Sequence, residues 1–148
     1  MKLNALILTI AMSSALTAGA QDGLNINSLF NGPYRDNVHA TETVISGSGL
    51  WEYNLSVYHS LTLSGLPGEV SVFEAAVMKD AAGALDKEVA FRNGRLYYGY
   101  YTLKPVPDSE LNRYLFYLNQ HAVGKDKLIL IYIEGRAGRT AVKRMLKK

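Results

Sequence analysis

The stretch DKEVAFRNGRLYYGYYTL, residues 86–103, decides the fold. Two runs that contain β-branched and aromatic residues, 86–92 and 95–103, flank the pair Asn93-Gly94. Both positions of this pair tolerate a positive φ, so the pair closes a two-residue hairpin whose twist matches that of the strands. The stretch therefore predicts a β-hairpin within an antiparallel sheet.

The hairpin continues as a meander toward the C-terminus. Pro105 and Pro107 interrupt the ladder, because proline has no backbone N–H to donate. Beyond them, residues 113–120 and 128–134 predict two more strands, and a terminal helix is expected from about Thr140. The last strand, LILIYIE, is apolar on both faces, which indicates a strand buried on both sides rather than a free edge.

Upstream of the hairpin, residues 69–83 carry apolar side chains at helical spacing, which predicts an amphipathic helix. Residues 38–45 predict a strand, and a short helix is expected within 21–37. Residues 50–63 fit either a strand throughout or a turn of helix followed by a strand, and we favour the strand.

The expected fold class is therefore α+β. It has an antiparallel sheet of five to six strands, with a helix before a four-strand meander and another helix after it. The two helices can cover one face of this sheet. The second face then needs the N-terminal segment, strong sheet curvature or another molecule.

The N-terminus predicts export. A positive start precedes an uncharged run over residues 3–20, which ends on the small residues AGA that a signal peptidase reads. We expect a signal peptide at residues 1–20 and a single domain at 21–148, in the periplasm, outside the cell or in the cell envelope; the alternative is an uncleaved N-terminal anchor. Since the chain has no cysteine, a lipoprotein anchor and thiol chemistry are excluded.

Positive charge gathers at the C-terminus. The chain carries a net charge of +3, and residues 136–148 contain no acid. A cationic amphipathic helix in this segment could lie on an anionic lipid or polymer, or dock its apolar side on the sheet with its cations in solvent. The candidate anion contacts are Arg136, Arg139, Lys143 and Arg144.

Tyrosines crowd two neighbouring strands. A tyrosine combines an apolar ring with a hydroxyl that tolerates water, which suits a glycan or protein contact, although cross-strand ring packing explains the same residues. Alternation places Tyr98 and Tyr100 opposite Tyr97 and Tyr101, so one pair is expected in the core. Nucleic acid is not expected as a partner, because these strands lack interleaved lysine and arginine. The candidate interaction surface consists of Tyr97, Tyr98, Tyr100, Tyr101, Tyr114 and Tyr117.

No motif predicts catalysis, a cofactor or a metal ion. The three histidines are scattered, and GRAGRT at residues 135–140 lacks the glycine and lysine that a Walker A loop needs. Carboxylates surround the predicted helix at 69–83 and the strand that follows it, but nothing in the sequence brings two of them together. We expect a protein that is not an enzyme, has no catalytic or metal-binding residues and uses no cofactor.

Several segments resemble a small exported family of unknown function from Bacteroidota. They are LSVYHSLTL at 55–63, ALDKEV at 84–89, LYYGYY at 96–101, RYLFY at 113–117 and IYIEG at 131–135. The resemblance implies a Gram-negative periplasmic or surface setting, and it carries no activity or catalytic residues.

Three classes of function follow. The favoured one is an exported, non-enzymatic envelope protein that binds another envelope protein or an envelope polymer. The alternatives are peripheral binding of anionic lipid or polymer through the C-terminal helix, and an unrecognised hydrolase. Membrane contact is expected to be at most peripheral, and a homo-oligomer is left open.

Overall fold

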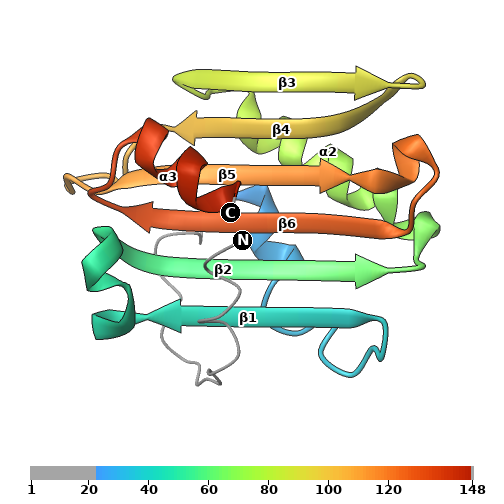
Figure 1. The fold of residues 1–148 in the computed structure, drawn as a ribbon, viewed down its shortest axis with the longest axis horizontal. Coiled ribbons are helices and arrows are strands. Elements are labelled where there is room, and N and C mark those ends of the chain that lie inside the picture. Colours follow the sequence, from blue (N-terminus) through green and yellow to red (C-terminus); the bar gives the residue numbers. More distant parts are fainter. Residues whose placement is uncertain (1–22, 148) are drawn as a thin grey trace.

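Six antiparallel strands form one sheet in the order β1-β2-β6-β5-β4-β3 (Figure 1). The computed structural model describes residues 23–147, so the signal peptide expected at residues 1–20 lies outside them. The α+β class is confirmed, and β3 to β6 form the predicted meander. The strands are β1 (Ala40–Ser46), β2 (Leu55–Ser64), β3 (Asp86–Arg92), β4 (Arg95–Leu103), β5 (Asn112–Asn119) and β6 (Lys127–Gly135).

The β3–β4 hairpin has the predicted boundaries. Asn93 and Gly94 have φ values of 53° and 77°, the left-handed region that this turn requires. β6 lies between β2 and β5, and it is buried on both faces, as its sequence predicts. The strand that comes last in the chain therefore occupies the middle of the sheet.

The two long helices, α2 (Val70–Ala81) and α3 (Arg139–Leu146), cover opposite faces of the sheet (Figure 1). The expectation that both cover one face is wrong. Phe73 of α2 packs in one core with Leu130, while Val142 of α3 packs in a second core with Ile131. Because β6 is apolar on both faces, each face needs its own covering helix.

The N-terminal segment joins α2 on its face of the sheet. The short 3-10 helix η3 (Asn25–Leu29) places Ile26 and Phe30 in the same core as Phe73. The Asp80 carboxylate of α2 accepts hydrogen bonds from the backbone N–H groups of Asn25 and Ile26, at 2.7 and 2.9 Å. These bonds satisfy N–H groups at the start of the helix that have no partner within it.

Three further 3-10 helices connect the main elements: η4 (Gly47–Tyr53), η5 (Pro67–Glu69) and η6 (Gln120–Val123). The second strand favoured within 50–63 is present as β2, which begins at Leu55, and η4, which ends at Tyr53, precedes it. Asn54 between them has a φ of 57°, which is incompatible with a continuous strand. No helix within residues 23–147 is long and apolar enough to cross a membrane.

Candidate functional site

The six candidate tyrosines do not form one surface. Tyr100 and Tyr114 pack in the α3 core, and Tyr101 and Tyr117 pack in the α2 core; all four are at most 2% exposed. The expectation of a six-tyrosine interaction surface is therefore wrong, because a helix covers β4 and β5 on each face. The remaining two, Tyr97 and Tyr98, are partly exposed.

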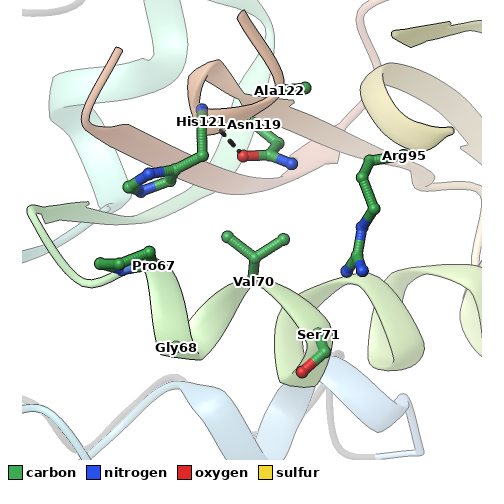
Figure 2. A pocket seen from close by; sticks show the side chains of 8 residues that line it. All are labelled: Pro67, Gly68, Val70, Ser71, Arg95, Asn119, His121 and Ala122. Carbon is green, nitrogen blue, oxygen red and sulfur yellow. Dashed lines mark hydrogen bonds between the residues drawn. The ribbon is translucent and has the colours of Figure 1, made fainter. Parts of the chain in front are cut away.

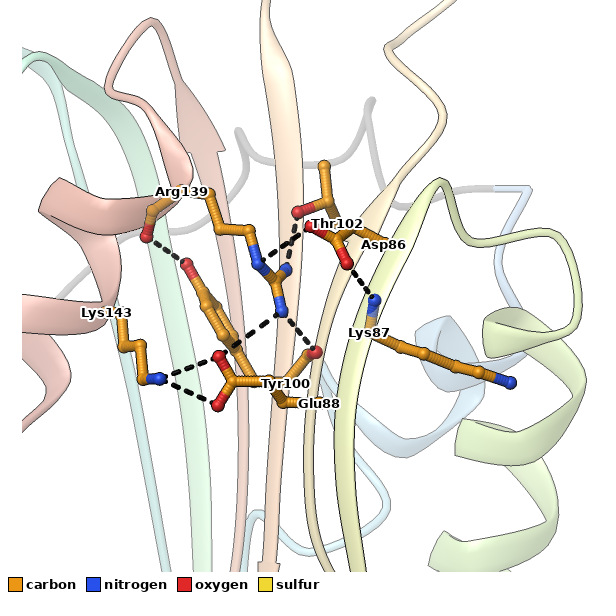
Figure 3. A network of polar contacts seen from close by, with 7 residues as sticks. All are labelled: Asp86, Lys87, Glu88, Tyr100, Thr102, Arg139 and Lys143. Atoms are coloured by element: carbon orange, nitrogen blue, oxygen red, sulfur yellow. Dashed lines mark hydrogen bonds and ion pairs between the residues drawn. The ribbon is translucent and has the colours of Figure 1, made fainter.

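The α3 helix is held to the edge of the sheet by ion pairs (Figure 3). Lys143 Nζ lies 2.7 Å from both carboxylate oxygens of Glu88, and Arg139 Nε lies 3.3 Å from a carboxylate oxygen of Asp86. The Arg139 guanidinium also stacks over the Tyr100 ring at 4.3 Å, and the Tyr100 hydroxyl donates to the Arg139 carbonyl at 2.8 Å. The hydrogen bond from Lys143 lowers the pKa of Glu88.

Three of the four candidate anion contacts form ion pairs within the chain. Carboxylates of β3 pair with Arg139 and Lys143, and Arg136 pairs with Glu110 at the surface. The pairing of Arg139 with Asp86 could not be predicted from the sequence, because the two residues meet only in the folded chain. The two cations that remain exposed are Arg136 and Arg144.

A histidine and a carboxylate pair on the α2 face of the sheet. His59 Nε2 lies 2.7 Å from Glu42 Oε2, and the same oxygen accepts the Asn31 backbone N–H at 2.7 Å. Burial alone would raise the pKa of Glu42, but the hydrogen bonds from His59 and Asn31 lower it below its usual value. The centroid of the Phe30 ring lies 3.9 Å from that of the fully buried imidazole, so the ring covers the histidine. The pair ties β1, β2 and the N-terminal segment together.

A second buried carboxylate lies nearby on β6. The Tyr132 hydroxyl donates to Glu134 Oε2 at 2.8 Å, and Glu134 is directly opposite Arg113 across the β5–β6 ladder. Burial raises the pKa of Glu134. Residues 23–147 contain no cluster of three or more acidic or histidine side chains that could hold a metal ion.

A cavity of about 310 Å³ opens between the start of α2 and the 3-10 helix η6 (Figure 2). Arg95 and His121 line opposite ends of it, with Val70 between them. Arg95 Nε and His121 Nε2 make no hydrogen bond, but both atoms are shielded from solvent. A ligand in this cavity therefore reaches neither nitrogen unless the side chains move, and the Arg95 guanidinium already pairs with Glu74 at 2.7 Å.

The most open apolar surface follows β3, which is one edge of the sheet. Val89 and Phe91 of β3 point to the α2 face, because Val89 pairs with Gly99 and then Tyr117 in that core. Glu74 of α2 accepts the Leu96 backbone N–H at 2.8 Å, and Leu96 pairs with Phe91. Met78 lies one turn after Glu74, on the same side of the helix. We name this set the β3 surface; its members, each 42% to 62% exposed, are Met78, Leu85, Val89 and Phe91.

The opposite edge of the sheet is protected. β1 has the sequence ATETVIS, and its charged residue, Glu42, points inward to His59. Polar residues and an inward-pointing charge on an edge strand discourage pairing with another chain. β3 has four charged residues, but it also exposes the apolar side chains Val89 and Phe91. The two edges therefore differ in the chemistry that governs strand addition.

The fold and its surfaces define a single-sheet α+β domain whose edge strand β3 exposes Val89 and Phe91, and residues 23–147 contain no group of acidic and histidine side chains that could hold a metal ion. The chain belongs to a family of unknown function, DUF6108, whose family model matches residues 13–146. No curated protein and no solved structure matches the chain significantly.

Proposed function

We propose that this protein is an exported, non-enzymatic module that binds an extended segment of a partner polypeptide along β3. The observation that carries the proposal is the exposure of Val89 and Phe91 on an edge strand. An edge strand presents backbone N–H and C=O groups that an added strand can pair with. In such complexes the backbone bonds supply affinity, and alternate side chains supply specificity. The sequence pattern of residues 1–20 supports export, and the resemblance to an exported family supports a setting in the envelope of Bacteroidota.

The site specifies the chemistry of the partner segment. The irregularity in the β3–β4 ladder lies on β4, where Tyr97 has no partner between Tyr98 and Leu96, so β3 itself has no extra residue along its free edge. Lys79, Lys87 and Arg92 are exposed around the apolar residues. An extended segment in which apolar and acidic residues alternate would complement the exposed apolar side chains and the cations around them.

Photocrosslinking tests this proposal in cells that make the protein. The photoreactive residue p-benzoylphenylalanine replaces Phe91 in one variant and Thr41, on the opposite edge, in the control. We expect a covalent adduct with another protein at position 91 only, and loss of that adduct when Val89→Lys is added. Sequencing of the crosslinked peptide is expected to show an extended segment with alternating apolar and acidic residues.

Two results contradict the proposal. One is equal crosslinking from positions 41 and 91, which would indicate non-specific contact. The other is a position-91 adduct that Val89→Lys does not weaken, although that variant keeps the circular dichroism spectrum of the parent. Val89 is 42% exposed, so the substitution leaves the core intact.

A further inference from the structure

A second cavity, of about 260 Å³, opens where η4 meets the end of β6. Trp51, the single tryptophan of the chain, lines it and is 69% exposed. Tryptophan supplies a large apolar ring, and it is enriched in protein–protein interfaces and their hot spots. The ring of Trp51 is mostly outside the core of this domain, which leaves it open to a ligand in the cavity.

Arg136 supplies a cation to the lining of the same cavity. Its backbone N–H donates to the Asn54 carbonyl at 2.9 Å, which fixes the main chain of the loop in place. Its guanidinium is 68% exposed and pairs with Glu110, itself 82% exposed, at 3.0 Å. Solvent screens such an exposed pair and makes it weak, so another carboxylate can replace Glu110.

Hydrogen-bonding groups complete the cavity wall. Asn54 and Ser56 line the cavity together with Trp51 and Arg136. An amide and a hydroxyl both donate and accept hydrogen bonds. Arg136 also begins the basic segment in which Arg144 is exposed, so positive charge extends beyond the cavity.

We propose that this cavity binds an acidic polysaccharide. The C–H face of a pyranose ring stacks on the Trp51 indole, and the sugar carboxylate pairs with the Arg136 guanidinium in a bidentate geometry. Sugar hydroxyls bond to Asn54 and Ser56. The proposal is independent of the β3 surface, because β6, β5 and β4 separate β2 from β3 in the sheet.

Fluorescence of Trp51 tests the proposal directly, since no other tryptophan contributes to the signal. The probe is tetragalacturonate, and its neutral counterpart, galactotetraose, is the matched control. We expect a saturable change in emission with tetragalacturonate and about tenfold weaker binding of the neutral oligomer, which lacks the charge pair. Arg136→Gln is expected to weaken tetragalacturonate binding about tenfold, whereas Arg92→Gln on β3 leaves it unchanged.

Glu110→Gln is expected to strengthen tetragalacturonate binding, in contrast to Arg136→Gln. Removing that carboxylate frees the Arg136 guanidinium, so tetragalacturonate binds more tightly. The proposal is overturned if neither oligomer gives a saturable change, if both bind equally, or if Arg136→Gln binds like the parent. A response to phosphatidylglycerol vesicles without a response to tetragalacturonate overturns it as well and assigns the cavity to lipid. All of these side chains are exposed, so the variants keep the fold.

Discussion

Lys143 on α3 and Glu88 on β3 form a two-point ion pair, with the lysine Nζ 2.7 Å from each carboxylate oxygen. The pair joins the C-terminal helix to the edge strand, 55 residues earlier in the chain. Glu88 is 42% exposed, so solvent screens the attraction. The pair therefore helps to position α3 on the sheet but adds little to the free energy of unfolding.

Lys143→Met is therefore expected to lower the free energy of unfolding by about 0.5 kcal/mol at neutral pH. The pKa of Glu88 lies below its ordinary value of 4.5 in the folded chain, so this contribution is complete above that pH and is lost as the pH falls through the lowered pKa. Urea unfolding at neutral and acidic pH measures both effects. An equal loss at both values would contradict the assignment, and Arg144→Gln on the same helix serves as the control.

Two buried tyrosines are expected to respond oppositely to loss of the hydroxyl. The Tyr114 hydroxyl donates to the Ala137 carbonyl at 2.7 Å, whereas the Tyr117 hydroxyl makes no hydrogen bond within the described residues. Tyr114→Phe should lower the free energy of unfolding by about 1 kcal/mol, while Tyr117→Phe should leave it unchanged or raise it. Urea unfolding of the two variants distinguishes them, and equal losses would refute the contrast.

The pair formed by Glu42 and His59 is expected to contribute more, because His59 is fully buried and the Glu42 side chain is only 19% exposed. Glu42→Gln should lower the free energy of unfolding by about 2 kcal/mol at neutral pH, since a charge-assisted bond is lost. The pKa of Glu42 is lowered in the folded chain, so the difference between variant and parent shrinks as the pH falls below the ordinary carboxyl value. Denaturant titrations across this range provide the measurement. Glu110→Gln, at an 82% exposed site, should stay within about 0.5 kcal/mol of the parent.

Gly135, the last residue of β6, lies against the backbone of Asn54 and Leu55, where β2 begins. A Cβ at this position would lie 2.6 Å from both the Asn54 carbonyl oxygen and the Leu55 Cα, and backbone atoms cannot swing aside. Gly135→Ala should therefore lower the free energy of unfolding by about 2 kcal/mol. Thermal melts compare it with Gly68→Ala, where no atom lies within 4 Å of the added Cβ. Similar melting temperatures for the two variants would argue against the close approach.

Local signals explain why the hairpin could be predicted. Asn93-Gly94 requires no distant partner to form its turn, so both boundaries of β3 and β4 follow from the sequence. The location of the tyrosines could not be predicted in the same way. Alternation shows that Tyr100 and Tyr101 lie on opposite faces, but only the folded chain shows that α2 and α3 cover one face each.

The sequence carries part of the information needed to predict the pair formed by His59 and Glu42. Alternation along β2 places His59 on the same face as Leu61 and Leu63, and a buried imidazole needs a partner. Glu42 supplies it only once the β1–β2 register is known, because that register makes the two residues diagonal neighbours. The exposure of Trp51 could not be predicted, because no pattern in the surrounding sequence indicates that its ring lies at the surface.

The position of β6 determines the order in which the sheet can be assembled. β1 pairs with β2, β3 pairs with β4 and β4 pairs with β5, but only β6 joins the two groups. Without residues 127–135 no strand connects them. The six-stranded sheet therefore cannot close before the last of its strands has been synthesised.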